Sequence, residues 1–126
     1  MSNQERPRAL VIEDDRDLRH LYAQALEESG FTVVEAHNGL QAVEKATEFQ
    51  PDVVVTDLGL PGIDGYEVCR RLHKNGFSHV PIVAITGRYL AEADIQRALR
   101  EGCRTVLIKP VSLDRLSEEI LRVIQA

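Results

Sequence analysis

The sequence predicts an α/β fold, an open and doubly wound parallel sheet with helices on both faces. Apolar runs of strand length alternate with segments of helical period along the whole chain, which is the pattern of repeated βαβ units. The 126 residues are enough for one domain with a sizeable core, and no low-complexity stretch divides them. Polar groups directly follow four of the apolar runs: Glu13-Asp14, Asp57, Thr86 and Lys109.

The first two βα units are predicted between residues 8 and 50. The strand of residues 8–13 leads to a helix that Gly30 ends. A second strand, residues 32–36, is less apolar than a central strand, which indicates an edge of the sheet. Asn38 is the predicted N-cap of the next helix, with Gln41 in the supporting position. The expected buried positions of the first helix are Leu18, Leu21, Tyr22, Ala25 and Leu26.

The third and fourth units surround the most apolar strand. Residues 52–57 contain three consecutive valines, so we expect a strand that is buried on both faces. Asp64 caps the following helix, and Pro81 is tolerated at the first residue of the fourth strand. Gly102 ends the fourth helix. The expected apolar side of that helix consists of Ala91, Ile95, Ala98 and Leu99.

The fifth unit completes the predicted domain. Residues 105–108 form the last strand, and Ser112 caps the last helix. The core stripe of that helix is Leu113, Leu116, Ile120 and Ile124. Residues 1–7 precede the first strand and are expected to be flexible.

Composition narrows the classes of partner. There are 15 Lys and Arg against 20 Asp and Glu, a net charge of -5, and no basic stripe, which argues against direct nucleic-acid binding. No apolar stretch approaches the roughly 20 residues of a membrane span, and residues 1–8 lack the apolar segment of a signal peptide. We therefore expect a cytoplasmic protein. Cys69 and Cys103 have neither metal-ligand nor CxxC spacing and are interpreted as packing residues.

The strand ends carry the predicted chemistry. Ligands of open α/β sheets gather at the carboxyl ends of the strands, and neighbouring strands lie roughly 4.8 Å apart. If the first and third strands pair, Glu13, Asp14 and Asp57 nearly touch. Three negative charges against the one positive charge of Lys109 leave about -2, which one divalent cation would cancel, and oxygen ligands favour Mg²⁺. Without metal, one carboxyl group should have a raised pKa. The alternative interpretation is that Glu13, Asp14 and Asp15 form only a solvated loop and helix-cap cluster. For Asp15 alone, a helix-cap role is the favoured interpretation.

Asp57 is the best candidate for a nucleophile toward phosphorus. A carboxylate beside a metal and opposite an amine can attack a phosphoryl group whose charge both cations neutralise. The Thr86 hydroxyl is placed to donate to a phosphoryl oxygen. Taken singly, Thr86 is an ordinary strand or cap residue and Lys109 a solvated strand-end charge. Their common position at the correct ends of their strands favours the functional reading.

With these motifs, the sequence resembles the receiver domain of two-component response regulators, the CheY-like family, over essentially its whole length. The resemblance implies a flavodoxin-like (βα)5 sheet of strand order 2-1-3-4-5 and a single receiver domain over residues 1–126. The residues that carry the resemblance are Glu13-Asp14, Asp57 with Leu60-Pro61-Gly62-Ile63-Asp64-Gly65, Thr86-Gly87 and Lys109-Pro110.

The resemblance also implies partners and a cofactor. Asp57 would accept a phosphoryl group from a sensor histidine kinase or a histidine phosphotransfer protein. Asp14 and Asp57 would bind Mg²⁺ directly and Glu13 through water, and the backbone carbonyl of Gly59 would complete the protein ligands. A downstream protein of unknown identity would read the state of the domain, which is expected to be a monomer or weak dimer.

The remaining implied roles concern the switch. Lys109 would pair with Asp57 and then with its phosphate, and the Lys109-Pro110 peptide bond would be cis. Thr86 would move toward the phosphate. Many similar domains have an aromatic residue where this chain has Val106, so an aromatic switch is missing and the output is expected to be altered. Arg88 flanks the predicted site and is a candidate for setting phosphoryl lifetime.

Three alternatives remain open at this stage. A phosphatase with an aspartyl-phosphate intermediate typically needs a second Asp two residues beyond the nucleophile, where this chain has Gly59. A flavodoxin-like nucleotide-binding module would need a Gly-rich loop where Glu13-Asp14 stands. A pseudo-receiver that is never phosphorylated is disfavoured because every required residue is present. We therefore expect no enzyme beyond Mg²⁺-dependent phosphotransfer to, and dephosphorylation of, the domain itself.

Overall fold

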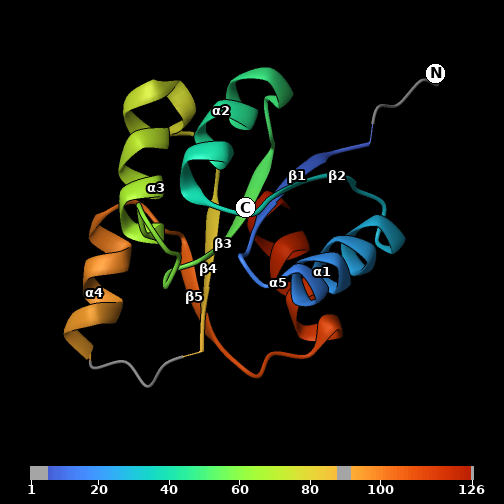
Figure 1. Ribbon diagram of the computed structural model, residues 1–126. Coiled ribbons are helices and arrows are strands. Elements are labelled where there is room, and N and C mark those ends of the chain that lie inside the picture. Colours follow the sequence, from blue (N-terminus) through green and yellow to red (C-terminus); the bar gives the residue numbers. More distant parts are fainter. Residues whose placement is uncertain (1–5, 88–91, 126) are drawn as a thin grey trace.

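The computed structural model describes residues 6–87 and 92–125 and contains a parallel sheet enclosed by helices (Figure 1). The sheet has five strands in the order β2-β1-β3-β4-β5, which confirms the predicted 2-1-3-4-5 order. The strands are β1 (Arg8–Ile12), β2 (Thr32–Ala36), β3 (Val53–Asp57), β4 (Ile82–Thr86) and β5 (Thr105–Ile108). The predicted edge strand is confirmed, since β2 lies outermost beside β1.

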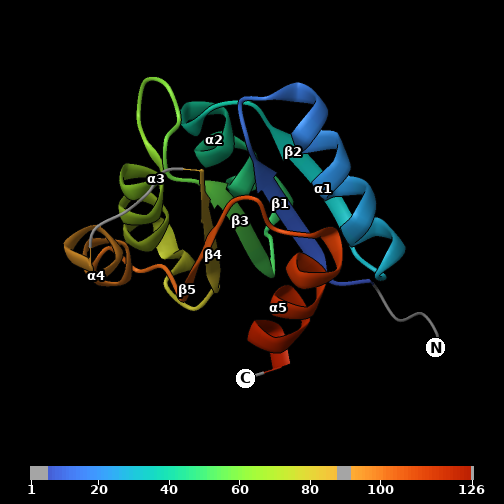
Figure 2. The same cartoon turned by 90° about the horizontal axis from the view of Figure 1, so that it is seen from below.

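The helices cover both faces of the sheet (Figures 1 and 2). Helices α2, α3 and α4 pack on one face, and α1 and α5 pack on the other. The segment η1 (His73–Phe77) follows α3 directly and was not predicted; it is not a regular helix, because Asn75 and Gly76 have non-helical backbone angles. The helices are α1 (Arg16–Glu28), α2 (Gly39–Phe49), α3 (Gly65–Leu72), α4 (Glu92–Arg100) and α5 (Leu113–Gln125).

Alternation along the strands divides the core into two layers. Leu10 and Ile12 of β1 point to the face of α2 and α3, whereas Ala9 and Val11 point to the face of α1 and α5. All four side chains are buried. The central strands are therefore continuous apolar runs because both of their faces are covered.

Capping residues set the helix boundaries much as the sequence predicts. The side chains of Asn38 and Asp64 accept hydrogen bonds from the third residue of α2 and α3, and Ser112 does the same for α5. Gly30 and Gly102 follow α1 and α4 with φ angles of 105° and 112°, a backbone region that favours glycine. These local signals explain why the predicted and observed elements coincide.

Three predicted core leucines are instead exposed. Leu21, Leu99 and Leu113 are 48%, 40% and 38% exposed. In α1 the buried stripe centres on Tyr22 and Leu26 and extends to Ala23. Leu21 lies about 100° around the helix from Tyr22, on the opposite margin of the stripe. The helical period was right, but the rotation of the helix against the sheet was not.

Arg6 and Pro7, which lead into β1, are hydrogen-bonded to the segment between the end of α1 and the start of β2. Arg6 donates from Nε to the Gly30 carbonyl at 3.1 Å and from Nη2 to the Glu27 carbonyl at 2.9 Å. The Pro7 carbonyl accepts from the Thr32 amide at 2.9 Å. Residues 1–5 of the segment predicted to be flexible lie outside the described residues, as do Arg88 and Ala91. Across the parts of the chain that are described, no helix combines the length and the apolar character that crossing a membrane requires.

Candidate functional site

Strand pairing brings the predicted site residues to one edge of the sheet. Strands β1 and β3 are neighbours, with Ile12 opposite Thr56, so Glu13 and Asp57 follow adjacent strand positions. Strands β4 and β5 continue the same edge, and the chain reaches Lys109 directly after β5. The parallel order therefore delivers side chains that are distant in sequence to one crevice.

The three acidic side chains form one cluster. Glu13, Asp14 and Asp57 each offer a carboxylate oxygen, and these oxygens all lie within 4.8 Å of one another. Glu13 is only 2% exposed, whereas Asp14 is exposed and Asp57 is partly buried. This confirms the predicted proximity of the carboxylates. A site made only of oxygen donors with this much negative charge suits a hard divalent cation such as Mg²⁺.

Lys109 binds two of the carboxylates at once. Its Nζ lies 2.9 Å from Asp57 Oδ2 and 3.0 Å from Glu13 Oε1. The Lys109 side chain is 23% exposed, so it is not the solvated strand-end charge of the alternative reading. A Cβ at Gly87 would lie 3.2 Å from the Lys109 Cδ, so this glycine lets the lysine stem pass close to the backbone. The Lys109-Pro110 peptide bond is cis, as expected.

Asp57 is held from its other side as well. The Gly59 amide donates to Asp57 Oδ1 at 2.8 Å, while Lys109 occupies Oδ2. The first residue of α3 approaches the same strand end, because a Cβ at Gly65 would lie 2.5 Å from the Asp57 carbonyl oxygen. Only glycine fits there, and the carboxylate that ends β3 is fixed in one orientation.

Charge and burial shift the pKa values of this cluster. Burial raises the pKa of Glu13 above its ordinary value, and the nearby Asp57 charge acts in the same direction against hydrogen bonds from the Asp15 amide and Lys109. This agrees with the expectation that one carboxyl group has a raised pKa. Burial alone would lower the pKa of Lys109, but hydrogen bonds to Asp57 and Glu13 and their negative charges raise it. Lys109 therefore remains an ammonium ion at neutral pH.

Thr86 ends β4 at the same edge of the sheet. It is buried, and its carbonyl accepts a hydrogen bond from the Lys109 amide at 2.7 Å. Val106, which stands where similar domains often have an aromatic residue, packs partly buried against the α2, α3 and α4 side of the core. The movement of Thr86 and the effect of Val106 on output stay predictions.

Three supporting hydrogen bonds, from Asp15 and Arg19, were not predicted from the sequence. The Asp15 amide donates to Glu13 Oε2 at 3.1 Å, in addition to the expected capping role of the Asp15 side chain. Arg19 donates from Nη1 to the Glu13 carbonyl at 2.9 Å and from Nε to Glu35 at 2.9 Å. No spacing rule marks Arg19, because its contacts depend on how α1 lies against β1 and β2.

This sheet order, with three carboxylates clustered at the strand ends and a lysine bound to two of them, defines a flavodoxin-like α/β domain with an acidic site. Residues 9–121 match the model of the response regulator receiver domain. The chain belongs to this family, the receiver domains of two-component signalling.

Among curated relatives, the chain is similar to the polar-differentiation response regulator DivK of Brucella anthropi, with 32% identity over 116 residues that cover 90% of this chain and 94% of DivK. A CheY-like receiver domain from Methanospirillum hungatei has the same fold, with a TM-score of 0.89, 24% identity and coverage of 96% and 95%. The receiver domain of a DNA-binding response regulator from Colwellia psychrerythraea matches with a TM-score of 0.85, 27% identity and coverage of 95% and 99%.

Proposed function

We propose that this chain is a phosphorylation-dependent switch or phosphoryl shuttle in which Asp57 accepts a phosphoryl group. The observation that carries the proposal is the position of the Asp57 carboxylate, which lies beside the carboxylates of Glu13 and Asp14 and accepts a hydrogen bond from the Lys109 ammonium. Receiver domains receive their phosphoryl group from sensor histidine kinases or histidine phosphotransfer proteins. We infer the same class of donor here.

In the proposed transfer, an Asp57 carboxylate oxygen attacks phosphorus and forms an O–P bond. The N–P bond of the donor phosphohistidine breaks, and its imidazole keeps the electron pair and takes a proton. Lys109 stays within hydrogen-bond distance of the Asp57 carboxylate, so its charge offsets the charge on the phosphoryl oxygens. The Gly59 amide holds the other carboxylate oxygen and restricts rotation of the nucleophile.

We propose that Glu13, Asp14, Asp57 and the backbone carbonyl of Gly59 would hold Mg²⁺. The fit rests on charge and donor type, since three carboxylates and one ammonium leave about -2 and all side-chain ligands are oxygens. Bound Mg²⁺ would supply charge neutralisation for the transferred group. Asp14 is the exposed member of the cluster, which favours it as the carboxylate that meets a cation from solvent.

The phosphatase alternative is less well supported. Gly59 occupies the position where such enzymes carry a second carboxylate, and its amide is engaged with Asp57 Oδ1. The chain offers no general acid at that position. We therefore propose that its chemistry is limited to its own phosphorylation and dephosphorylation.

The change of state is proposed to involve Thr86. A phosphorylated Asp57 would carry about two negative charges, and the Thr86 hydroxyl and Lys109 are the groups at the same sheet edge that can bind them. Val106 has no ring to rotate when Thr86 moves. The readout of the switch is therefore proposed to depend on backbone shifts at the ends of β4 and β5.

The proposal is tested by intact-mass analysis after incubation with acetyl phosphate and Mg²⁺. We expect an adduct of about 80 Da that chelator and Asp57→Ala abolish. Asp17→Asn is the matched control, because Asp17 is an exposed acid of α1 outside the cluster, and this variant should be phosphorylated like wild type. An adduct that survives Asp57→Ala would contradict the assignment. Failure with both acetyl phosphate and a phosphohistidine donor would favour the pseudo-receiver.

A further inference from the structure

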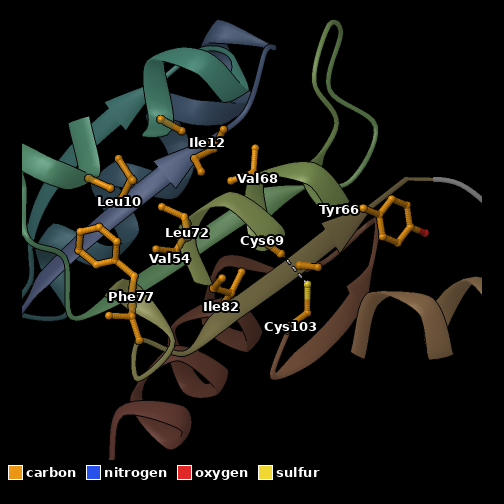
Figure 3. Packing of buried hydrophobic residues seen from close by; sticks show 14 of the residues in the cluster. Leu10, Ile12, Val54, Tyr66, Val68, Cys69, Leu72, Phe77, Ile82 and Cys103 are labelled. Atoms are coloured by element: carbon orange, nitrogen blue, oxygen red, sulfur yellow. Dashed lines mark hydrogen bonds between the residues drawn. The ribbon is translucent and has the colours of Figure 1, made fainter. Parts of the chain in front are cut away.

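The two cysteines of this chain meet in the core and are not part of the acidic cluster. Cys69 lies in α3, and Cys103 lies in the connection between α4 and β5, 34 residues away in sequence. Their sulfur atoms are 3.0 Å apart, and both residues are free thiols. Figure 3 shows the two side chains pointing toward each other within the buried cluster that Val68 and Leu72 also line.

We propose that Cys69 and Cys103 are a redox modification site that forms a reversible intramolecular disulfide when a hydroperoxide acts as oxidant. A disulfide requires a sulfur–sulfur distance of about 2.0 Å, so the two atoms need to approach by only about 1 Å from where they stand. The chain contains two cysteines in total, and each is buried. Contact between them favours pairing within one molecule over pairing between molecules.

The order of the two steps follows from burial. Cys69 is fully buried, whereas the Cys103 residue is 5% exposed, so we assign the first oxidation to Cys103. Its thiolate attacks a peroxide oxygen, which breaks the O–O bond and gives a sulfenic acid and water. Cys69 then attacks the sulfenic sulfur, the S–S bond forms, and a second water leaves. Two thiols and one hydrogen peroxide thus give one disulfide and two waters, and the two electrons pass from sulfur to oxygen.

Burial also predicts that oxidation is slow. The hydrogen bond with Cys103, followed by burial, raises the pKa of the Cys69 thiol, so Cys69 is poor in thiolate at rest. Access to Cys103 requires local opening of the end of α4. Once formed, the bond would tie α3 to the segment that enters β5, and amide exchange in α4 should become slower.

The expected stability effect is a higher Tm. Closing a 34-residue loop in the unfolded chain raises the Tm of a domain of this size by about 10 °C. Addition of a dithiol reductant should return the Tm to that of the untreated protein. The shift is measured by differential scanning calorimetry on oxidised and reduced wild type.

The decisive experiment is intact-mass and peptide analysis after treatment of the full chain with hydrogen peroxide. We expect a mass lower by about 2 Da, a linked peptide pair containing Cys69 and Cys103, and complete reversal by dithiothreitol. In Cys69→Ala the linked pair cannot form, and a sulfenic acid should instead be trapped at Cys103 by dimedone. Cys103→Ala should show little trapping, because Cys69 is shielded.

A second measurement keeps the test decisive if a variant fails to fold. Wild type is oxidised in parallel in denaturant, where both thiols are accessible. The proposal is overturned if folded wild type gains oxygen at either cysteine without losing about 2 Da, or stays unmodified over hours while the denatured chain reacts. These outcomes are independent of Asp57 and of the proposed phosphorylation.

Discussion

Replacing Lys109 by methionine should destabilise the metal-free protein and make its stability depend on Mg²⁺. The ammonium of Lys109 is bound at 3.0 Å to Glu13, a carboxylate that is only 2% exposed, and at 2.9 Å to Asp57. Methionine keeps much of the volume of the lysine stem but removes the charge. Glu13 and Asp57 would then face each other without a cation.

The size of the effect follows from burial of the partners. Removing one member of a fully buried ion pair costs about 3–5 kcal/mol. Because Lys109 is 23% exposed and Asp14 lies in solvent, water screens part of the charge interaction. We therefore expect Lys109→Met to lower the free energy of unfolding by about 2–3 kcal/mol in chelator. The net charge of the cluster changes from about -2 to about -3, so Mg²⁺ should restore more stability to the variant than to wild type.

The assay is urea unfolding with and without Mg²⁺, followed by circular dichroism. The double variant Glu13→Gln, Lys109→Met is the control, because it removes the buried charge together with its partner. In the Glu13→Gln background, the Lys109→Met substitution should lower the free energy of unfolding by only about 1 kcal/mol. Equal losses in the two backgrounds, or a Lys109→Met variant as stable as wild type in chelator, would refute the reasoning.

Three further perturbations test other features. Hydrogen bonds from two arginines of α5 lower the pKa of Glu119 from 4.5 to about 2, so its stabilisation is complete above pH 4.5 and is lost as pH falls toward 2. This loss should be about 1 kcal/mol of unfolding free energy, because the two arginines are exposed to solvent, and acid titration of Glu119→Gln should not show it. Gly102→Ala should cost more in chemical denaturation than Gly30→Ala, because both φ angles are positive but only at Gly102 would the Cβ meet the His73 ring, at 2.4 Å. Asn38→Ala should cost about 1 kcal/mol by thermal unfolding, since it removes the N-cap of α2.

The sequence predicted well the helices and strands and the proximity of the carboxylates to Lys109. Caps such as Asn38 and Asp64 act within a few residues of their own position, and their boundaries could be read from short patterns. The gathering of Glu13 and Asp57 follows from strand ends and strand order rather than from any side-chain detail. Both kinds of inference need only the backbone.

Contacts between elements were harder to predict. The bridge from Lys109 to Glu13, added to its expected partner Asp57, depends on the path of a long side chain across the sheet edge. The contact between Cys69 and Cys103 depends on the rotation of α3 relative to the end of α4, which periodicity does not specify. The exposure of Leu21 has the same origin. The spacing of apolar residues predicts which face of a helix is apolar, but packing against the sheet decides how much of that face is buried.

The close approach of α3 to the end of β3 has a consequence for the connection between them. Gly65 is pressed against the Asp57 carbonyl, and its amide donates to the Leu58 carbonyl at 3.1 Å, so the two ends of residues 58–65 are pinned together. Pro61 and Gly62 at the far end of this connection are exposed. Gly59 also belongs to this connection and holds Asp57 Oδ1, but Pro61 and Gly62 come after it, so residues added between Pro61 and Gly62 should leave the position of Asp57 unchanged. This tip is therefore a suitable place to graft a peptide tag or a fluorescent reporter onto a working domain.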